Sequence, residues 1–177
     1  MTTFLDLALR RRSIRKYQDK PVEAEKIQTI LQAGLASPSG KHLNPWEFVV
    51  VTDHDILTRM STCRTYGSSM LNGSPLGIVV CLDTALADTW QCDGAIAALN
   101  MLLCAEDLGL GGCWVQVNGR TLSEDDSVTA DEYIRSLLAI PDNLTVLCIV
   151  SIGYKLEDKK PINIDKLQYE KIHYGKY

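Results

Sequence analysis

Residues 90–117 read WQCDGAIAALNMLLCAEDLGLGGCWVQV, a long apolar run that passes through a glycine turn into a second apolar segment. Its first part predicts a helix over residues 88–108 that is apolar on nearly all sides. Such a helix must be covered by the other elements of a thick core or by a second subunit. The glycine turn at 109–112 ends it, and residues 113–117 follow as an extended segment. We therefore expect a buried central helix joined by a tight turn to a strand.

Shorter patterns flank this unit on both sides. Helices are predicted from residue 4 to about 13, over 23–35, from 53 to about 63 and over 133–138, and strands over 47–52, 76–82 and 145–152. Residues 64–75 are rich in Gly and Ser and predict neither. Helices and strands interleave without a repeat or a linker. We therefore expect one α/β or α+β domain over residues 1–177, with a small central sheet.

The composition excludes several classes of protein. The 177 residues carry a net charge of −4, so the chain as a whole has no electrostatic attraction for nucleic acid. Six cysteines occur without a CxxC pair, which favours reduced, buried thiols over a disulfide framework. The longest apolar run, residues 95–105, is too short to span a bilayer, and no signal peptide is recognisable. We expect a cytoplasmic protein with no metal site and no nucleic-acid or membrane partner.

A basic segment, RRRSIRK at residues 10–16, stands out against this acidic background. Charge runs usually face solvent, and cations suit the C-terminal end of a helix, so a solvated helix end is one interpretation. The other is a phosphate site, because arginine forks form charge-assisted bonds to phosphate and the hydroxyl of Ser13 adds a donor. The residues alone leave both interpretations open.

A second polar segment, SPSGKHLNPW at residues 37–46, predicts a tight turn that runs into an apolar strand. Pro38 fixes one backbone dihedral, Gly40 permits close approach, and Ser37 and Ser39 supply short donors. Loops of this composition are common, so the segment alone predicts no more than a turn.

Together, the two segments resemble the N-terminal signature of the nitroreductase family, homodimeric flavoenzymes that bind FMN. The resemblance covers nearly the whole chain. It is strong at residues 11–15, 37–50, 90–114 and 150–154 and weakest at 55–75 and 118–140, which would shape the substrate pocket. It implies an α+β fold of three layers, α-β-α, with a small, mostly antiparallel central sheet. It also implies an intertwined homodimer with two FMN sites at the interface.

The resemblance assigns the FMN phosphate to the basic segment. Arg11, Arg12 and Ser13 match the residues that hold phosphate in the family. Members often complete this site with basic residues after the last strand, and Lys159 and Lys160 are the candidates here.

Three further positions would contact the flavin ring. Arg15 would face the N1/O2 edge, where a fixed cation favours the reduced anion. The backbone at Gln116 and Val117 would face N5, although the family more often has glycine or an acid at these positions.

The turn would cover the flavin from the partner subunit through Pro38, Ser39, Gly40 and His42. Two residues depart from the family pattern, since His42 replaces the usual Asn and Asn44 replaces the usual Gln. An imidazole can still donate a hydrogen bond, but its charge varies near neutral pH.

The function that the resemblance implies is a ping-pong reaction. NADH or NADPH would give hydride to flavin N5, and an electron-poor acceptor such as a nitroaromatic or a quinone would then take it. No catalytic side chain is predicted, because the cofactor carries the chemistry. Two alternatives stay open: a relative that dehalogenates aromatics or fragments flavin, and a flavin-binding dimer without enzymatic activity.

Overall fold

The computed structural model describes residues 3–122 and 127–177. The helices of this part are α1 (Phe4–Arg10), α2 (Ala24–Leu35), α3 (His54–Met60), α4 (Trp90–Asp107) and α5 (Ala130–Leu138). The strands are β1 (Trp46–Val51), β2 (Leu76–Asp83), β3 (Gly111–Gln116) and β4 (Leu144–Gly153). Short 3-10 turns lie at Gly40–His42 and Ser69–Gly73, the second within the segment that the sequence left unassigned.

The four strands form one sheet in the order β1-β2-β4-β3. Each neighbouring pair is antiparallel, which confirms the small antiparallel sheet expected from the sequence. The two inner strands, β2 and β4, are almost wholly buried. Strand β3 is last in this order, so one side of it is an open edge of the sheet.

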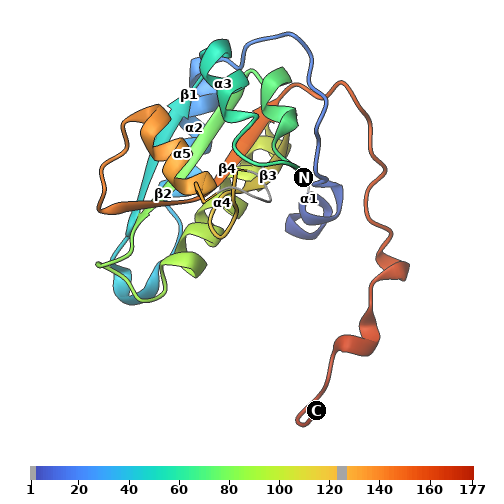
Figure 1. The fold of residues 1–177 in the computed structure, drawn as a ribbon. Helices are drawn as coiled ribbons and strands as arrows, with labels where there is room; N and C mark the ends of the chain where they lie inside the picture. The colour runs from blue at the N-terminus through green and yellow to red at the C-terminus, as the bar shows by residue number, and fades with distance from the viewer. Residues whose placement is uncertain (1–2, 123–126) are drawn as a thin grey trace.

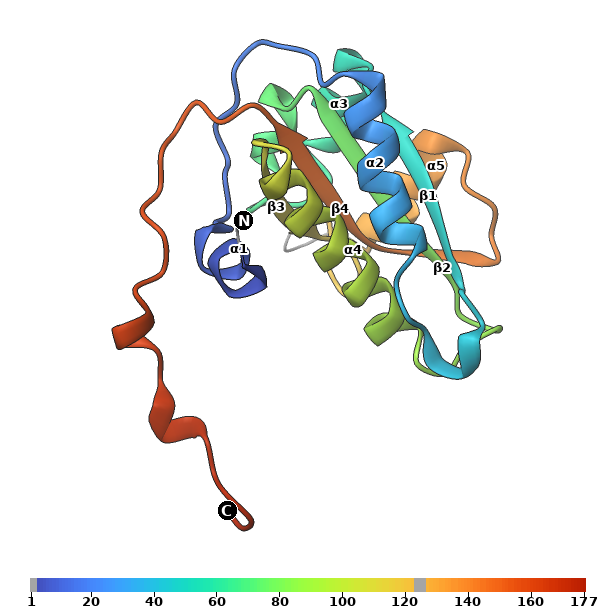
Figure 2. The same ribbon diagram turned by 180° about the vertical axis from the view of Figure 1, so that it is seen from behind.

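Helices cover both faces of the sheet. Alternate residues of β2 point to opposite faces, as a pleated strand requires. Ile78 and Val80 pack with α2 and α4, whereas Val79 and Cys81 pack with α3 and α5. Figure 2 shows α2 and α4 in front of the sheet, and Figure 1 shows α3 and α5 on the opposite side. The arrangement is the predicted α-β-α sandwich.

The central helix α4 is covered on one side by its own chain. Its buried residues are Asp93, Gly94, Ala97, Ala98, Met101, Leu102, Ala105 and Glu106. Ile96 and Leu99, by contrast, are 38% and 47% exposed. A long apolar helix that keeps such side chains in water is typical of a subunit interface.

The first helix ends at Arg10, three residues before the position predicted for it near Ser13. Beyond Arg11 the chain is extended, because Ser13 forms a parallel bridge with Gly112 and the Ile14 N–H donates to the Gly112 carbonyl at 3.0 Å. This pairing is with a residue about a hundred positions away, so the local helical pattern could not reveal it.

The chain ends in an arm that leaves the body of the molecule (Figures 1 and 2). Every residue from 161 to 177 is exposed, including the apolar side chains of Ile162, Leu167 and Ile172. Within the described residues, none of the helices combines the length and hydropathy needed to cross a bilayer.

Candidate functional site

The basic segment lies along the open edge of β3, at the glycine turn. Ile14 is buried there, and a Cβ at Gly111 would approach its Cγ1 to 2.7 Å. The turn therefore needs glycine so that the basic segment can pack directly on the strand. Arg11, Arg12 and Ser13 are held at the start of β3 by this contact.

The chain segment after β4 returns to the same place. Lys159 Nζ donates to the Ser13 carbonyl at 2.6 Å, and the Arg12 guanidinium donates to the Lys160 carbonyl. The ammonium of Lys159 thus reaches the basic segment, whereas Lys160 offers its carbonyl and has an exposed side chain. Of the two lysines suggested by the sequence, the structure brings Lys159 to the predicted phosphate site.

A carboxylate orders this cluster. Glu157 Oε1 accepts from the Arg15 N–H at 2.7 Å and lies 3.3 Å from Lys159 Nζ. The bond from the Arg15 backbone is the main reason why the pKa of Glu157 is lowered from its ordinary value. The side chain of Arg15 itself is exposed, so its charge is available to a ligand on this surface.

Cys113 lies beneath the basic cluster and is 2% exposed. Burial raises the pKa of its thiol, against the opposing charges of Arg15 and Lys159 and a hydrogen bond from Ser13. A buried thiol with a raised pKa is a poor nucleophile. The cysteine beside the site is therefore not equipped for covalent catalysis.

The far end of β3 presents a backbone donor to the open edge. Backbone groups of successive residues in an edge strand point alternately toward the neighbouring strand and away from it. The Val117 N–H points inward and donates to the Leu147 carbonyl at 3.2 Å. The Gln116 carbonyl points outward, where it accepts from Arg64 Nη1 at 3.0 Å, so the N–H of Gln116 also faces the open edge.

The side chain of Gln116 fixes this end of the strand. Its Oε1 accepts from Trp114 Nε1 at 2.9 Å, and its Nε2 donates to the Asn118 carbonyl at 2.9 Å. Arg64 is a candidate that the sequence did not reveal, because it lies in the unassigned segment 64–75 and its partner is 52 residues away.

The polar turn at residues 37–46 is also held by hydrogen bonds, but to the first turn of α4. The Gly40 N–H donates to Asp93 Oδ1 at 2.9 Å, and Thr89 Oγ1 donates to Asp93 Oδ2 at the same distance. A Cβ at Gly40 would lie 2.3 Å from Thr89 Oγ1, so the close approach expected of this glycine is real. Ser39 Oγ accepts from the Asn44 N–H at 2.9 Å.

The outer residues of the turn face solvent. Pro38 and His42 are both exposed, and His42 has a positive φ of 59°. The outer surface of the turn is therefore left exposed by its own chain.

The basic segment and the turn lie at opposite ends of α4. Asp93, in the first turn of the helix, holds Gly40. Glu106, near its last residue, accepts from Lys155 Nζ at 2.8 Å with both oxygens, next to the basic segment. Thirteen residues of helix separate the two, which is about 20 Å at 1.5 Å per residue. Within one chain, the two halves of the predicted site do not meet.

Comparison with known proteins identifies the family. The family model described as "Nitroreductase family" matches residues 8–64 and 63–154. The structure of an FMN-dependent nitroreductase from Clostridium difficile R20291 shares 45% identity at a TM-score of 0.95, covering 98% of this chain and 100% of that one.

Two curated relatives agree. A protein of Archaeoglobus fulgidus, provisionally named NADH dehydrogenase/NAD(P)H nitroreductase, is 36% identical over 182 residues and covers 100% of both chains. An NADPH-flavin oxidoreductase of Vibrio harveyi is 31% identical over 170 residues, which cover 87% of this chain and 66% of that protein. The resemblance seen in the sequence and the nitroreductase fold are confirmed, and the chain belongs to the nitroreductase family.

Proposed function

We propose that this protein is an FMN-dependent oxidoreductase that uses NADH or NADPH to reduce electron-poor acceptors such as nitroaromatics and quinones. The observation that carries the proposal is the edge of β3, which has a cluster of cations at one end and an outward backbone N–H at the other. Gly112 and Gln116 mark these ends, and four residues of strand separate them by about 13 Å.

The cations fit a phosphate dianion. Arg11, Arg12 and Lys159 supply charge, and the hydroxyl of Ser13 supplies a further donor. Glu157 holds Lys159 in place, so the ammonium does not have to be ordered when the ligand arrives. Lys160 contributes through its carbonyl, which orients Arg12.

The remaining strand edge suits the flavin ring. FMN held here would supply the hydride chemistry through its N5 atom. The Gln116 N–H would face this atom, and Arg15 would lie at the N1/O2 edge, where a cation favours the reduced anion. Arg64 fixes the Gln116 peptide from the same side. Val117 serves by holding the strand end through its bond to Leu147.

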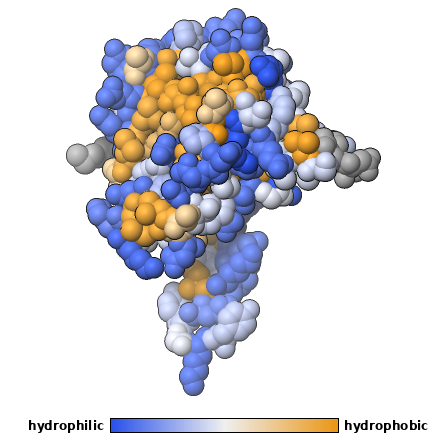
Figure 3. Space-filling model, turned by 60° about the vertical axis from the view of Figure 1, so that its left-hand side comes forward, coloured by the Kyte–Doolittle hydropathy of each residue, from blue (hydrophilic) through white to orange (hydrophobic). Residues whose placement is uncertain are grey.

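The complete site requires a second copy of the chain. Pro38, Ser39, Gly40 and His42 belong to a turn about 20 Å from the basic segment of the same chain, at the other end of α4. In a homodimer the turn of one chain covers the flavin held by its partner. Figure 3 shows apolar surface both on the body and on the arm below it. On α4, the side chains of Ile96 and Leu99 are also exposed. These surfaces support an interface in which the two chains are intertwined.

Steady-state turnover tests the proposal. We expect the FMN-loaded protein to oxidise NADH or NADPH with a quinone and with a nitroaromatic, giving the parallel double-reciprocal lines of a ping-pong reaction. A halogenated aromatic as acceptor tests the dehalogenating alternative in the same assay. Turnover with none of the three acceptors would leave the non-enzymatic flavin-binding dimer and refute the proposal.

A further inference from the structure

Strand β4 contains one extra residue near its start. Opposite it, Val80 of β2 pairs with Cys148 and Cys81 pairs with Val146, so Leu147 has no partner in β2. Such a bulge releases backbone groups from the ladder, and buried backbone groups must find other partners. In this protein the partners come from α5 and from the end of β3.

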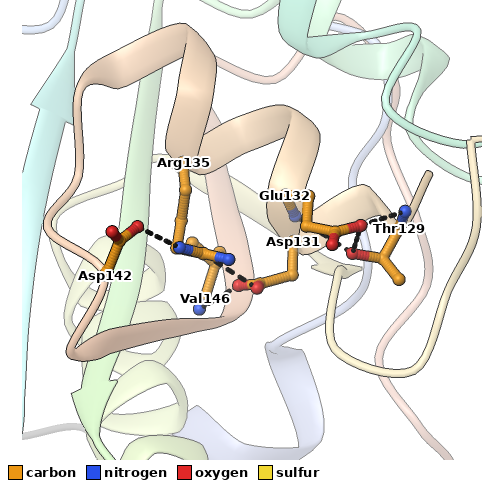
Figure 4. Close-up of polar contacts among 6 residues, drawn as sticks. All are labelled: Thr129, Asp131, Glu132, Arg135, Asp142 and Val146. Carbon is orange, nitrogen blue, oxygen red and sulfur yellow. Dashed lines mark hydrogen bonds and ion pairs between the residues drawn. The ribbon is translucent and has the colours of Figure 1, made fainter.

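One carboxylate of α5 accepts a hydrogen bond from the released N–H. Asp131 Oδ1 accepts from the Val146 N–H at 2.6 Å, and Oδ2 accepts from Arg135 Nε at 3.0 Å (Figure 4). Arg135 is fixed in turn by Asp142 Oδ1, 3.0 Å from its Nη1. The Asp131 side chain is 18% exposed, and both of its oxygens are bound. Asp131 therefore fixes the position of the bulge.

The carbonyl of the bulged residue accepts hydrogen bonds from the end of β3, next to the candidate flavin contact. Leu147 O accepts from the Val117 N–H at 3.2 Å and from the Asn118 N–H at 3.0 Å. These are the two residues after Gln116, and the Gln116 side chain is bonded to the Asn118 carbonyl. The direction of the Gln116 peptide therefore depends on where the bulge places one carbonyl oxygen.

We propose that Asp131 is a positioning residue for the flavin: by holding the bulge at Val146 and Leu147, it aims the Gln116 N–H at N5. The inference rests on the proposed function. An N–H aimed at N5 stabilises oxidised flavin, whose N5 accepts a hydrogen bond, and not reduced flavin, whose N5 carries a hydrogen. Asp131 thus acts on the preference of the site for one redox state.

The test is the ratio of the affinities for oxidised and reduced FMN, measured anaerobically on apoprotein. Asp131→Ala removes the acceptor, and we expect the preference for oxidised FMN to fall about fivefold, the net effect of one hydrogen bond. Asp131→Asn keeps an oxygen for the Val146 N–H and should restore most of the ratio. Asp142→Asn is the matched control, because it changes the other partner of Arg135 without touching Val146, and should leave the ratio unchanged.

A merely structural role predicts a different result. A general loosening of the structure weakens the binding of oxidised and reduced FMN alike and leaves the ratio of affinities unchanged. An unchanged ratio in Asp131→Ala therefore overturns the inference, as does an equal shift in Asp142→Asn. If Asp131→Ala does not fold, Arg135→Gln removes the side chain that orients the carboxylate, and the ratio must fall in the same direction. A wild-type protein that binds no FMN refutes the proposed function and this inference with it. If the wild type binds FMN and the ratio of affinities does not change when Asp131 is replaced, the inference alone is refuted.

Discussion

The two adjacent lysines after β4 give the sharpest test of the phosphate site. Lys159 Nζ lies 2.6 Å from the Ser13 carbonyl and 3.3 Å from Glu157, and its side chain is 28% exposed. Lys160 is exposed and contributes its carbonyl. Lys159→Met removes a charged bond worth about 1.5–3 kcal/mol, which weakens FMN binding by a factor of about 10–150. It also leaves the Glu157 carboxylate without its cation beside the phosphate, which adds to the loss.

Lys160→Met is the matched control, because the backbone carbonyl survives the substitution. An exposed cation contributes little, so we expect its FMN affinity to stay within about twofold of wild type. The assay is titration of apoprotein with FMN at low and high salt, followed by flavin fluorescence. Riboflavin, which lacks the phosphate, should bind Lys159→Met and wild type alike. Equal losses in the two variants, or an equal loss of riboflavin affinity in Lys159→Met, would refute the phosphate assignment.

Three further outcomes are expected. Arg15→Gln should retain FMN but make its two-electron potential more negative in anaerobic redox titration, by a shift equivalent to about 1–3 kcal/mol. An unshifted potential would contradict a position of Arg15 at the N1/O2 edge. The pKa of Glu157 is lowered in the folded protein. Its contribution to the free energy of unfolding is therefore complete above its ordinary pKa of 4.5 and is lost as pH falls through the folded pKa. The melting temperature of Glu157→Gln should therefore lie below that of wild type at neutral pH, and the two should converge in acid. Co-expressed chains carrying Gly40→Val and the pair Arg11→Ala, Arg12→Ala should recover one intact site per mixed dimer, although neither homodimer binds FMN well, and no recovery contradicts a turn acting in trans.

The sequence predicted the elements whose signal is local. Apolar runs gave β2 and β4 within a residue or two of their observed bounds, because both are buried on both faces. Helix α4 followed from its apolar length and from the glycine turn after it. The close approach at Gly40 could be expected from the residue type alone.

Sequence patterns did not predict the features that depend on contacts between residues far apart in the chain. The end of α1 depends on the pairing of Ser13 with Gly112, and the choice of Lys159 over Lys160 depends on which side chain reaches Ser13. Whether Gln116 or Val117 offers its N–H depends on which side of β3 is the open edge, and that is a property of strand order. Pattern reasoning along the chain contains none of this information.

We expect this fold to bind FMN at the edge of β3 and to pass the electrons of a nicotinamide to it. The most direct measurement is the visible spectrum of the purified, FMN-loaded protein before and after anaerobic addition of NADH or NADPH. We expect a bound oxidised flavin whose absorbance disappears when either donor is added and returns when a quinone follows. A protein that retains no flavin after dialysis, or a bound flavin that stays oxidised with both donors, would contradict this expectation.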